Sequence, residues 1–570
     1  MNLNIDAIKS MTYDAIVVGS GVSGGYAAKE LTEKGLRVLV LEKGKKFDHV
    51  TAYEPSYKDP WDFKYNGLLT NEQKASHPKL SRDYPYNEMT EKYWMNDSDA
   101  LYKEVKRFDW FRPDIVGGKS IMWGRQTYRL SDIDFEANLK DGIAVDWPIR
   151  YKDIAPWYSY VEKHVGISGE ALGLPQLPDS EFLKPMDMYC VEKEVRQRIE
   201  KNFPGRNMTI GRVANLSEAK EAQLKIGRSA CQYRNKCRLG CPYGAYFSTQ
   251  SCTLPPAAKT GLLTLRPDSV VSEILFDNAK QKATGVRVID TVTKDVREYF
   301  AKIIFVCGST VATTALLLNS KSSRFQNGLG NDSGELGHNL MDHHFRVGAA
   351  GTWEGDEDKY YIGRRANGIY IPRYRNIGND KRDYLRGFGY QGSGSRQSWN
   401  RGVNDMSFGA DYKDAMTKPG PWTMNLGGFG ETLPYHENKM YLDPTTKDKW
   451  GIPVVVFDAE FKENEMKMRK DMMEDAKEML ESAGLKNVRA FDNGSYPGMA
   501  IHEMGTARMG RDPKTSVLNG NNQLHGVKNV FVTDGACMTS TSCVNPSLTY
   551  MALTARAADF AVKESKKKHL

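Results

Sequence analysis

The stretch YDAIVVGSGVSGGYAAKELTEKGLRVLVLEKG, residues 13–44, decides the fold. Its apolar run Ala15–Val18 is typical of a buried parallel strand. Glycines with the spacing G-x-G-x-x-G follow at once, and a helical pattern with small and apolar residues on one face comes after them. A second apolar strand, Arg37–Leu41, ends at Glu42. Strand, glycine turn, helix and strand in this order predict a βαβ unit with a parallel sheet, and hence an α/β fold.

The glycines of this turn, Gly19, Gly21 and Gly24, predict a dinucleotide site. Glycine lets the backbone turn tightly and approach a pyrophosphate, whose negative charge is stabilised at the N-terminus of the helix. Glu42, at the tip of the second strand, is placed to accept a hydrogen bond from a ribose hydroxyl. A carboxylate there would repel a 2′-phosphate, which favours FAD or NAD over NADP. We include Ser23 among the cofactor-binding residues.

Length and composition exclude several classes of protein. A chain of 570 residues is too long for one compact core, so we expect two large domains. The 79 basic and 71 acidic residues give a net charge of +8, and no basic stripe with interleaved aromatic residues is present, so we expect no nucleic acid partner. No run of 18 or more apolar residues occurs, so we predict no transmembrane segment. The first ten residues, MNLNIDAIKS, contain neither an apolar h-region nor twin arginines, so we expect no export signal there.

A second loop of small residues, GGKSIMWGR, spans residues 117–125. It follows a segment, 47–109, that is rich in aromatic and charged residues and that we expect to wrap over a cofactor as loops and short helices. The small residues of the loop allow the backbone to pass close to a flat ligand, although an ordinary glycine turn is an alternative interpretation. The candidate cofactor contacts in it are Gly117, Gly118, Ser120 and Gly124.

Three cysteines stand close together in CQYRNKCRLGC, at Cys231, Cys237 and Cys241. Their basic neighbours would favour the thiolate, which is the form that binds metals. The spacing favours an iron–sulfur cluster over zinc, which is usually bound through C-x₂₋₄-C pairs and a fourth ligand, and unligated thiols are a third alternative. Three ligands suit a three-iron cluster, and Cys252 is available to complete a four-iron one.

The chain then returns to the dinucleotide domain. Strand patterns that include Val271 lead to the apolar strand Lys302–Val306, and CGSTVATTALLL follows as a small-residue turn and a helix. This order repeats the architecture of the first unit. We include Val271 and Gly308 among the cofactor-binding residues. In the next polar loop, GHNLMDHH, the residues expected to line the cofactor are Asn339, Asp342 and His343.

Residues 345–488 differ in character from the rest of the chain. The segments IYIPRYR, TMNLGGFGE, KMYLDP and PVVVFDAEF alternate as strands of an antiparallel sheet. The pattern at Met466–Ala483 predicts a long helix that ends at Gly484. A sheet with a helix and without a glycine fingerprint is expected to form the substrate domain.

The last part of the chain carries a second site signal. His502 lies in a glycine-rich, charged loop, AIHEMGTARMG, where a catalytic role and a structural role are both open. Further on, a strand that ends at Thr533 is followed by an alanine-rich helix, and a strand tip that leads to a helix N-terminus is again a phosphate site. The candidate residues there are Asp534, Gly535, Asn545 and Pro546.

Taken in order, VVGSGVSGG…LEKG, GGKSIMWG, LGHNLMDHH and HEMGTARMG…VTDGA…NPSLTYMALTARAAD resemble the glucose–methanol–choline (GMC) family of FAD oxidoreductases over nearly the whole chain. The resemblance implies a discontinuous, Rossmann-like FAD domain, residues 1–344 and 489–570, with an iron–sulfur insertion at 185–252. An antiparallel-sheet substrate domain, residues 345–488, is inserted into it. It also implies that His502 takes the proton of the substrate hydroxyl while a hydride passes to the flavin, and that Asn545 is its hydrogen-bonding partner.

Within the family, the cysteine segment is similar to that of bacterial FAD-dependent glucose dehydrogenases, which hold a 3Fe–4S cluster. GGKSIMWGR and DGIAVDWPIRYKDIAPWY are closer still to bacterial glucoside 3-dehydrogenases, which oxidise the C3 hydroxyl of glucosides. Pyranose oxidases carry a histidine for covalent flavin attachment at about the place of Met122, so non-covalent FAD is expected. The similar dehydrogenases work with a small accessory subunit and cytochrome c.

This resemblance implies a periplasmic location reached through a co-exported partner, with the cytoplasm as the alternative. The competing functions are an oxidase that uses oxygen at the flavin, a glucose 1-dehydrogenase, and a flavoprotein without substrate chemistry of its own. A cluster that takes electrons from the flavin favours the dehydrogenase, because it offers a path off the enzyme.

Overall fold

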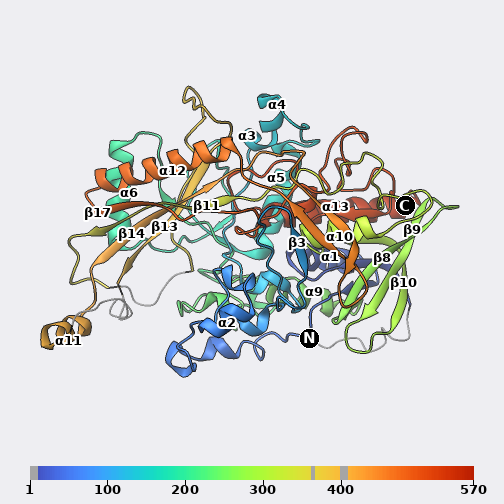
Figure 1. Cartoon of the computed structure of the whole chain (residues 1–570), viewed down its shortest axis with the longest axis horizontal. Coiled ribbons are helices and arrows are strands. Elements are labelled where there is room, and N and C mark those ends of the chain that lie inside the picture. Colours follow the sequence, from blue (N-terminus) through green and yellow to red (C-terminus); the bar gives the residue numbers. More distant parts are fainter. Residues whose placement is uncertain (1–10, 361–365, 398–407) are drawn as a thin grey trace.

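A computed structural model describes residues 11–360, 366–397 and 408–570 (Figure 1). The first ten residues, to which the expected lack of an export signal refers, lie outside these ranges. One end of the elongated molecule holds α12 (Glu463–Ser482), α6 (Cys190–Asn202) and β17 (Lys486–Asp492), and the opposite end holds β8 (Ser269–Asp277), β9 (Lys282–Asp290) and β10 (Val296–Val306).

The predicted βαβ unit is confirmed. It consists of β1 (Thr12–Val18), α1 (Val22–Glu33) and β2 (Val38–Leu41). The two strands pair in parallel from Ala15 opposite Val38 to Val18 opposite Leu41. All of β2 and the centre of β1 are buried, as the apolar runs require. The glycine turn therefore lies at the carboxyl edge of the sheet, where α/β folds bind ligands.

The first sheet has seven strands, in the order β7 (Leu263–Arg266), β2, β1, β10 (Val296–Val306), β9 (Lys282–Asp290) and β8 (Ser269–Asp277), with β18 (Val530–Val532) also paired to β10. The long strand β10 changes partners along its length. Its first half pairs antiparallel with β9, and its second half pairs in parallel with β1 and β18. Since β18 comes from the C-terminal segment, both ends of the chain build one sheet.

Helices pack on this sheet through small side chains. α13 (Ser547–Lys566) contacts both α1 and α5 (Tyr151–Val165). Its alanines, among them Ala557 and Ala558, are fully buried, and they let neighbouring helices approach closely. α9 (Leu254–Lys259) contacts α1, and α10 (Thr310–Asn319) follows β10 as the predicted second turn-and-helix unit.

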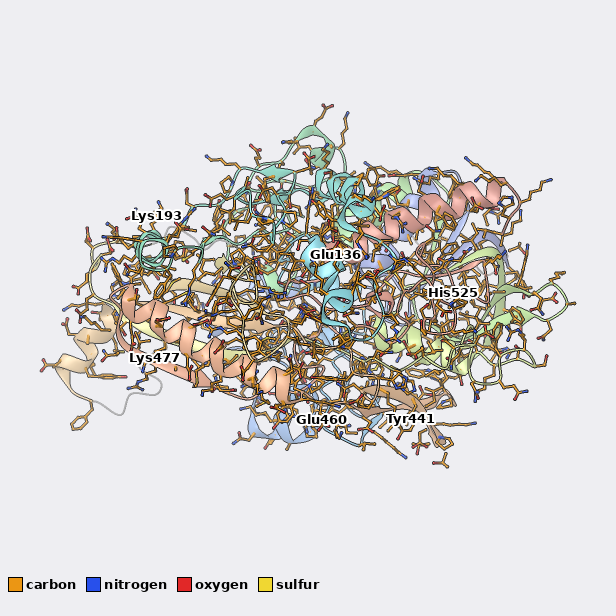
Figure 2. The ribbon with its side chains drawn as sticks, turned by 90° about the horizontal axis from the view of Figure 1, so that it is seen from above. Glu136, Lys193, Tyr441, Glu460, Lys477 and His525 are labelled. Atoms are coloured by element: carbon orange, nitrogen blue, oxygen red, sulfur yellow. The ribbon has the colours of Figure 1, made fainter. Side chains whose placement is uncertain are left out.

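The second sheet is antiparallel, in the order β17 (Lys486–Asp492), β11 (His344–Trp353), β14 (Trp422–Gly430), β13 (Phe388–Arg396), β12 (Ile369–Ile371) and β6 (Thr209–Ile210). Helices α12 (Glu463–Ser482) and α6 (Cys190–Asn202) pack beside it (Figure 1). The buried face of α12 includes Met468, Met472 and Met479, whereas Lys477 lies on its exposed face (Figure 2). The expected antiparallel sheet and long helix are both present.

Two of the strands expected in that sheet lie elsewhere. KMYLDP and PVVVFDAEF belong to β15 (Lys439–Lys447) and β16 (Pro453–Asp458), which form a separate three-stranded sheet with β3 (Tyr102–Glu104). The reason is an aromatic cluster: Phe457 of β16 stacks on Phe108, with ring centroids 3.9 Å apart, and also contacts Tyr102 and Trp110. These contacts hold the hairpin against the N-terminal half of the chain.

The remaining elements are short. Residues 47–109 form loops and short helices as expected, except for the strand β3. The shorter α-helices are α2 (Asn71–Ser76), α3 (Asp132–Phe135), α4 (Ala137–Asp141), α7 (Glu221–Leu224), α8 (Thr249–Cys252) and α11 (Ala410–Thr417). The short strands β4 (Ile167–Ser168) and β5 (Phe182–Leu183) pair with each other. The 3₁₀ turns are η2 (Glu54–Tyr57), η3 (Pro60–Asp62), η4 (Leu80–Arg82), η5 (Glu91–Tyr93), η6 (Gly118–Ile121), η7 (Cys237–Leu239) and η9 (Gly535–Cys537).

The boundaries of the two expected domains fall inside elements of the second sheet. The division into residues 1–344 with 489–570 and residues 345–488 stays a prediction; its second boundary falls inside β17, and β6 joins the substrate sheet from the cysteine-rich insertion. Among the helices that the structure describes, none combines the length and the apolar character needed to cross a membrane.

Candidate active site

A cavity of about 720 Å³ is lined by residues from the N-terminal, central and C-terminal segments of the chain. Most of the predicted cofactor contacts line it. These are Gly19, Gly21, Ser23, Glu42, Gly118, Ser120, Gly124, Val271, Gly308, Asp534, Gly535 and Asn545. His502 lines the same cavity, so the structure brings the two candidate catalytic residues and the dinucleotide loop together.

Three predicted contacts lie behind the cavity wall instead. Gly24 packs on the backbone of Gly19, and a methyl group on Gly24 would overlap the Gly19 carbonyl oxygen. The amide of Gly117 donates to the Ser20 hydroxyl at 2.8 Å, which ties the two glycine loops together. Pro546 caps α13, and the next residue, Ser547, reaches the cavity. These residues shape the site without lining it.

The N-terminus of α1 has the properties of an anion site. Its N-cap is Gly21, which provides no side-chain cap, and no acidic residue stands in the first turn. Its first backbone N–H groups therefore face the cavity without a carboxylate to compensate them. Apart from the adjoining backbone, no atom of the described residues lies within 4 Å of the place where a methyl group on Gly21 would stand. Open space at a helix N-terminus fits the pyrophosphate of FAD.

Glu42 is half-buried and already bound to the turn. Its Oε2 accepts from the amide of Ser20 at 2.9 Å and from the Ser20 hydroxyl at 2.6 Å, and its Oε1 accepts from the amide of Gly44 at 2.8 Å. Burial raises the pKa of this carboxyl group above its ordinary value, while the bonds from Ser20 and Gly44 oppose the rise. A carboxylate has about four lone-pair positions, so one remains for a ribose hydroxyl. The residues present therefore fit the cofactor.

The loop of His502 is fixed by a buried carboxylate. Asp342 accepts from the amides of Ala500 and His502, at 3.1 and 3.0 Å. The imidazole of His502 lies against His343, with the two Nδ1 atoms 3.1 Å apart. Burial, followed by the charges of His343 and Lys119, holds the pKa of His502 well below its ordinary value. At neutral pH the imidazole is therefore neutral and can accept a proton.

The amide of Asn545 is held by the substrate sheet. Its Oδ1 accepts from Nε2 of Gln391, a residue of β13, at 2.7 Å. Gln391 in turn accepts from Nε2 of Gln126 at 3.5 Å. Because its oxygen is engaged on this side, Asn545 has its Nδ2 group to donate to a ligand in the cavity. Gln126 and Gln391 also line the cavity.

Sequence reasoning assigned three residues of the 337–344 loop to the cofactor, and the structure places them differently. Asn339, Asp342 and His343 are buried and do not line the cavity. Asp342 and His343 hold the catalytic loop, and the amide of Asn339 bonds to Glu335. The positioning roles of His343 and Gln391 were missed, because only the folded chain brings them to His502 and Asn545.

The cysteine loop lies next to this cavity but does not form a metal site. Cys231, Cys237 and Cys241 are free thiols, and no group of three or more metal-ligating side chains occurs among the described residues. The iron–sulfur prediction is therefore not confirmed. Burial raises the pKa of Cys237 to about 12; Arg125 opposes this shift and the other two thiols add to it. The basic neighbours Arg125 and Arg238 thus lower the pKa of Cys237 as expected, but burial outweighs their effect.

Cys252 is not available as a fourth ligand. It is fully buried in α8, and its sulfur accepts from Nη1 of Arg228 at 3.3 Å. Arg125, which sequence reasoning did not single out, connects the two neighbouring loops. Its guanidinium donates to the carbonyl oxygens of Ile121 at 2.7 Å and Cys237 at 3.4 Å. The buried guanidinium of Arg125 therefore connects the loop of residues 117–125 to the cysteine loop.

Comparison with known proteins gives the family. Models of the GMC oxidoreductase family match residues 13–345 and 434–554. The chain is 30% identical to 2-methyl-1,2-propanediol dehydrogenase of Mycolicibacterium austroafricanum, over 96% of this chain and 94% of that protein. It is 24% identical to the fructose dehydrogenase large subunit of Gluconobacter japonicus, over 98% and 99%.

The fold is shared with a solved structure, pyridoxine 4-oxidase from Mesorbium loti, with a TM-score of 0.59 and 17% identity over 96% of this chain and 98% of that one. The resemblance found in the sequence motifs and the expected α/β fold with an FAD-type domain are thus confirmed. FAD is the cofactor that the family implies, and its reactions are oxidations of CH–OH groups. The chain belongs to the GMC oxidoreductase family.

Proposed function

We propose that this protein is an FAD-dependent dehydrogenase that oxidises a secondary hydroxyl of a sugar or glycoside to a ketone, acting as a glucoside 3-dehydrogenase with non-covalent FAD. The observation that carries the proposal is the pairing of a neutral imidazole, His502, with a held amide, Asn545, in the cavity that the dinucleotide turn also lines. Met122 lines this cavity too, and its thioether offers no nitrogen for covalent attachment.

Each side chain has a defined part in the reaction. Asn545 donates from Nδ2 to the substrate oxygen and holds it in place. His502 takes the hydroxyl proton, which leaves the electron pair on oxygen to form the carbonyl as the hydride departs from carbon. The chemistry that FAD supplies when bound is acceptance of that hydride. Phe429, whose ring lies 5.5 Å from that of His502, helps to exclude water.

The lining of the cavity favours a polyhydroxylated substrate. Amide groups of Gln126, Asn367 and Gln391 line it together with the rings of Phe429 and Trp123. Amides can bond to several hydroxyl groups, and ring faces suit the apolar faces of a pyranose. The names of two relatives, a diol dehydrogenase and a fructose dehydrogenase large subunit, support a dehydrogenase that acts on hydroxylated substrates. By the same analogy we propose an accessory subunit, an acceptor such as cytochrome c and a periplasmic location.

The function is tested by mixing the anaerobic holoenzyme with methyl glucoside and following the flavin absorbance. We expect bleaching and a product whose NMR spectrum shows a ketone at C3. Methyl glucoside is blocked at C1, so bleaching by free glucose alone would indicate a glucose 1-dehydrogenase. Rapid reoxidation in air with stoichiometric peroxide would indicate an oxidase. Reduction by simple diols and by no sugar would contradict the proposed substrate class.

We also propose that Cys231, Cys237 and Cys241 hold an iron–sulfur cluster of the 3Fe–4S type. Two observations support the proposal. The three cysteines stand close together on one loop, and Cys231 and Cys241 lie near enough to Cys237 to raise its pKa. The three thiols are not arranged as a metal site here, so they would have to close on the iron, and we derive no step of the reaction through it.

Cys237→Ser is expected to contain less than about one third of the iron of the wild-type protein while its flavin is still reduced by substrate. The physical reason is that a serine hydroxyl stays protonated at neutral pH and is a poor ligand for iron. Iron and flavin are measured on the same purified sample. Cys190→Ser, in α6 and outside the loop, is the control. Wild-type iron content in Cys237→Ser would contradict the ligand assignment, as would a wild-type protein that contains no iron.

A further inference from the structure

His343 lies behind His502 and touches no part of the cavity. It is fully buried, and it precedes β11, so its position is fixed by the start of the substrate sheet. Its ring is perpendicular to that of His502, at an interplanar angle of 88° with centroids 5.2 Å apart. The ring of Phe429 packs on both, with its centroid 4.7 Å from that of His343. The two imidazoles therefore form one packed unit.

The protonation of His343 follows from its two contacts. Its Nε2 lies 2.7 Å from the carbonyl oxygen of Ser542, which can only accept a hydrogen bond, so Nε2 carries a hydrogen. Burial lowers the pKa of His343 to about 4, and a neutral imidazole has one hydrogen only. Its Nδ1 therefore has a free lone pair and must accept. The partner of that atom is Nδ1 of His502, at 3.1 Å.

We propose that His343 is a positioning residue that fixes the tautomer of His502: it holds the hydrogen of His502 on Nδ1 and leaves the lone pair on Nε2, which is the atom that accepts the substrate proton. The alternative tautomer would place two lone pairs against each other at 3.1 Å and would leave a hydrogen where the base is needed. Because the carbonyl oxygen of Ser542 can only accept, it sets the direction of both hydrogen bonds: His343 donates to Ser542, and His502 donates to His343.

The hydrogen bond between His502 and His343 also has a function once His502 has accepted the proton. The resulting imidazolium keeps its Nδ1–H bond to a neutral His343, so the charge is stabilised without a carboxylate partner. The charged groups around the pair are Lys119, which forms an ion pair with Glu503 at 3.4 Å, and Asp342, whose oxygens are used by the backbone of the catalytic loop. Neither carboxylate bonds to the imidazole of His502, so the proton is not passed on to one.

Two variants separate positioning from structural support. His343→Gln can keep both contacts, because an amide oxygen can accept from His502 and an amide nitrogen can donate to Ser542. His343→Leu keeps the volume and loses both. We expect His343→Leu to reduce its flavin about 10- to 10²-fold more slowly with the substrate KM unchanged, and His343→Gln to recover most of the rate. His344→Leu removes a neighbouring buried imidazole whose ring packs on Phe461, and it is expected to leave the rate unchanged.

The tautomer itself is read from ¹⁵N NMR of histidine-labelled holoenzyme without substrate, with the His502 signals assigned by their loss in His502→Ala. We expect a protonated Nδ1 and an unprotonated Nε2 in the wild type and in His343→Gln. In His343→Leu we expect a mixture of tautomers. This measurement does not depend on the identity of the substrate, whereas the rates rest on the proposed function. A protonated Nε2 in the wild type, or equal rates for His343→Leu and wild type with FAD content and melting temperature preserved, would overturn the proposal.

Discussion

His502→Ala is expected to keep its FAD and to reduce that FAD with substrate about 10²- to 10⁴-fold more slowly than the wild type. The imidazole lines the cavity and is the group in position to take the hydroxyl proton. Without it, the substrate must lose its hydride while the hydroxyl is still protonated, which raises the barrier. The measurement is anaerobic flavin bleaching in the stopped-flow instrument at saturating substrate.

A matched histidine distinguishes loss of the base from a general effect of the substitution. His525 is half-buried, bonds to the hydroxyl of Ser516 at 2.9 Å and lies outside the lining of the cavity. It is labelled in Figure 2. His525→Ala is expected to reduce its flavin at the wild-type rate. Bleaching of His502→Ala at an unchanged rate would remove His502 from the mechanism.

The pH dependence of the wild type follows from the same residue. Free imidazole has a pKa of about 6.5 and loses its capacity as a base below that value. In the folded protein, burial and the charges of His343 and Lys119 lower the pKa of His502, so the neutral form persists to lower pH. The rate of flavin reduction is therefore expected to stay level from about pH 8 down to about pH 6. A decline centred near pH 6.5 would show that His502 is not shielded from solvent.

Much of the first domain could be predicted from the sequence because its signals are local. The G-x-G-x-x-G turn, the apolar strands on either side and Glu42 lie within one run of about 30 residues, and the structure has them as β1, α1 and β2. The same holds for α12, which a helical pattern predicts from Met466 to Ala483 and which the structure has at Glu463–Ser482.

The support behind the catalytic residues could not be predicted, because it depends on contacts between distant segments. His343 and His502 are 159 positions apart in the chain, and Gln391 and Asn545 are 154 apart. Nothing near Gln391 marks it as functional. The hairpin β15–β16 shows the same limit: its alternation predicts strands, but its sheet partner is β3, whose place is set by the aromatic contacts of Phe457.

The glycine turn offers the second large effect, as a pair of substitutions with different consequences. In Gly24→Ala, the methyl group would stand 2.8 Å from the carbonyl carbon of Gly19 and would overlap its oxygen. Both atoms belong to backbone, so α1 must move away from β1. We expect a loss of more than about 3 kcal/mol in the free energy of unfolding, together with loss of FAD. Thermal unfolding and the ratio of flavin to protein absorbance measure the two effects.

Gly21→Ala differs because, within the described part of the chain, the methyl group meets nothing within 4 Å beyond the adjoining backbone, and the φ angle of Gly21, −67°, suits alanine. The stability of the FAD-free protein is therefore expected to match that of the wild type. The methyl group instead occupies the space at the helix N-terminus that we assign to the pyrophosphate. Overpacking of about 1–3 kcal/mol there corresponds to FAD that dissociates roughly 5- to 150-fold more readily. Gly21→Ala with wild-type FAD affinity would show that the pyrophosphate lies elsewhere. This outcome does not depend on whether Gly24→Ala folds, because the methyl group on Gly21 affects cofactor binding without disturbing the packing of the turn.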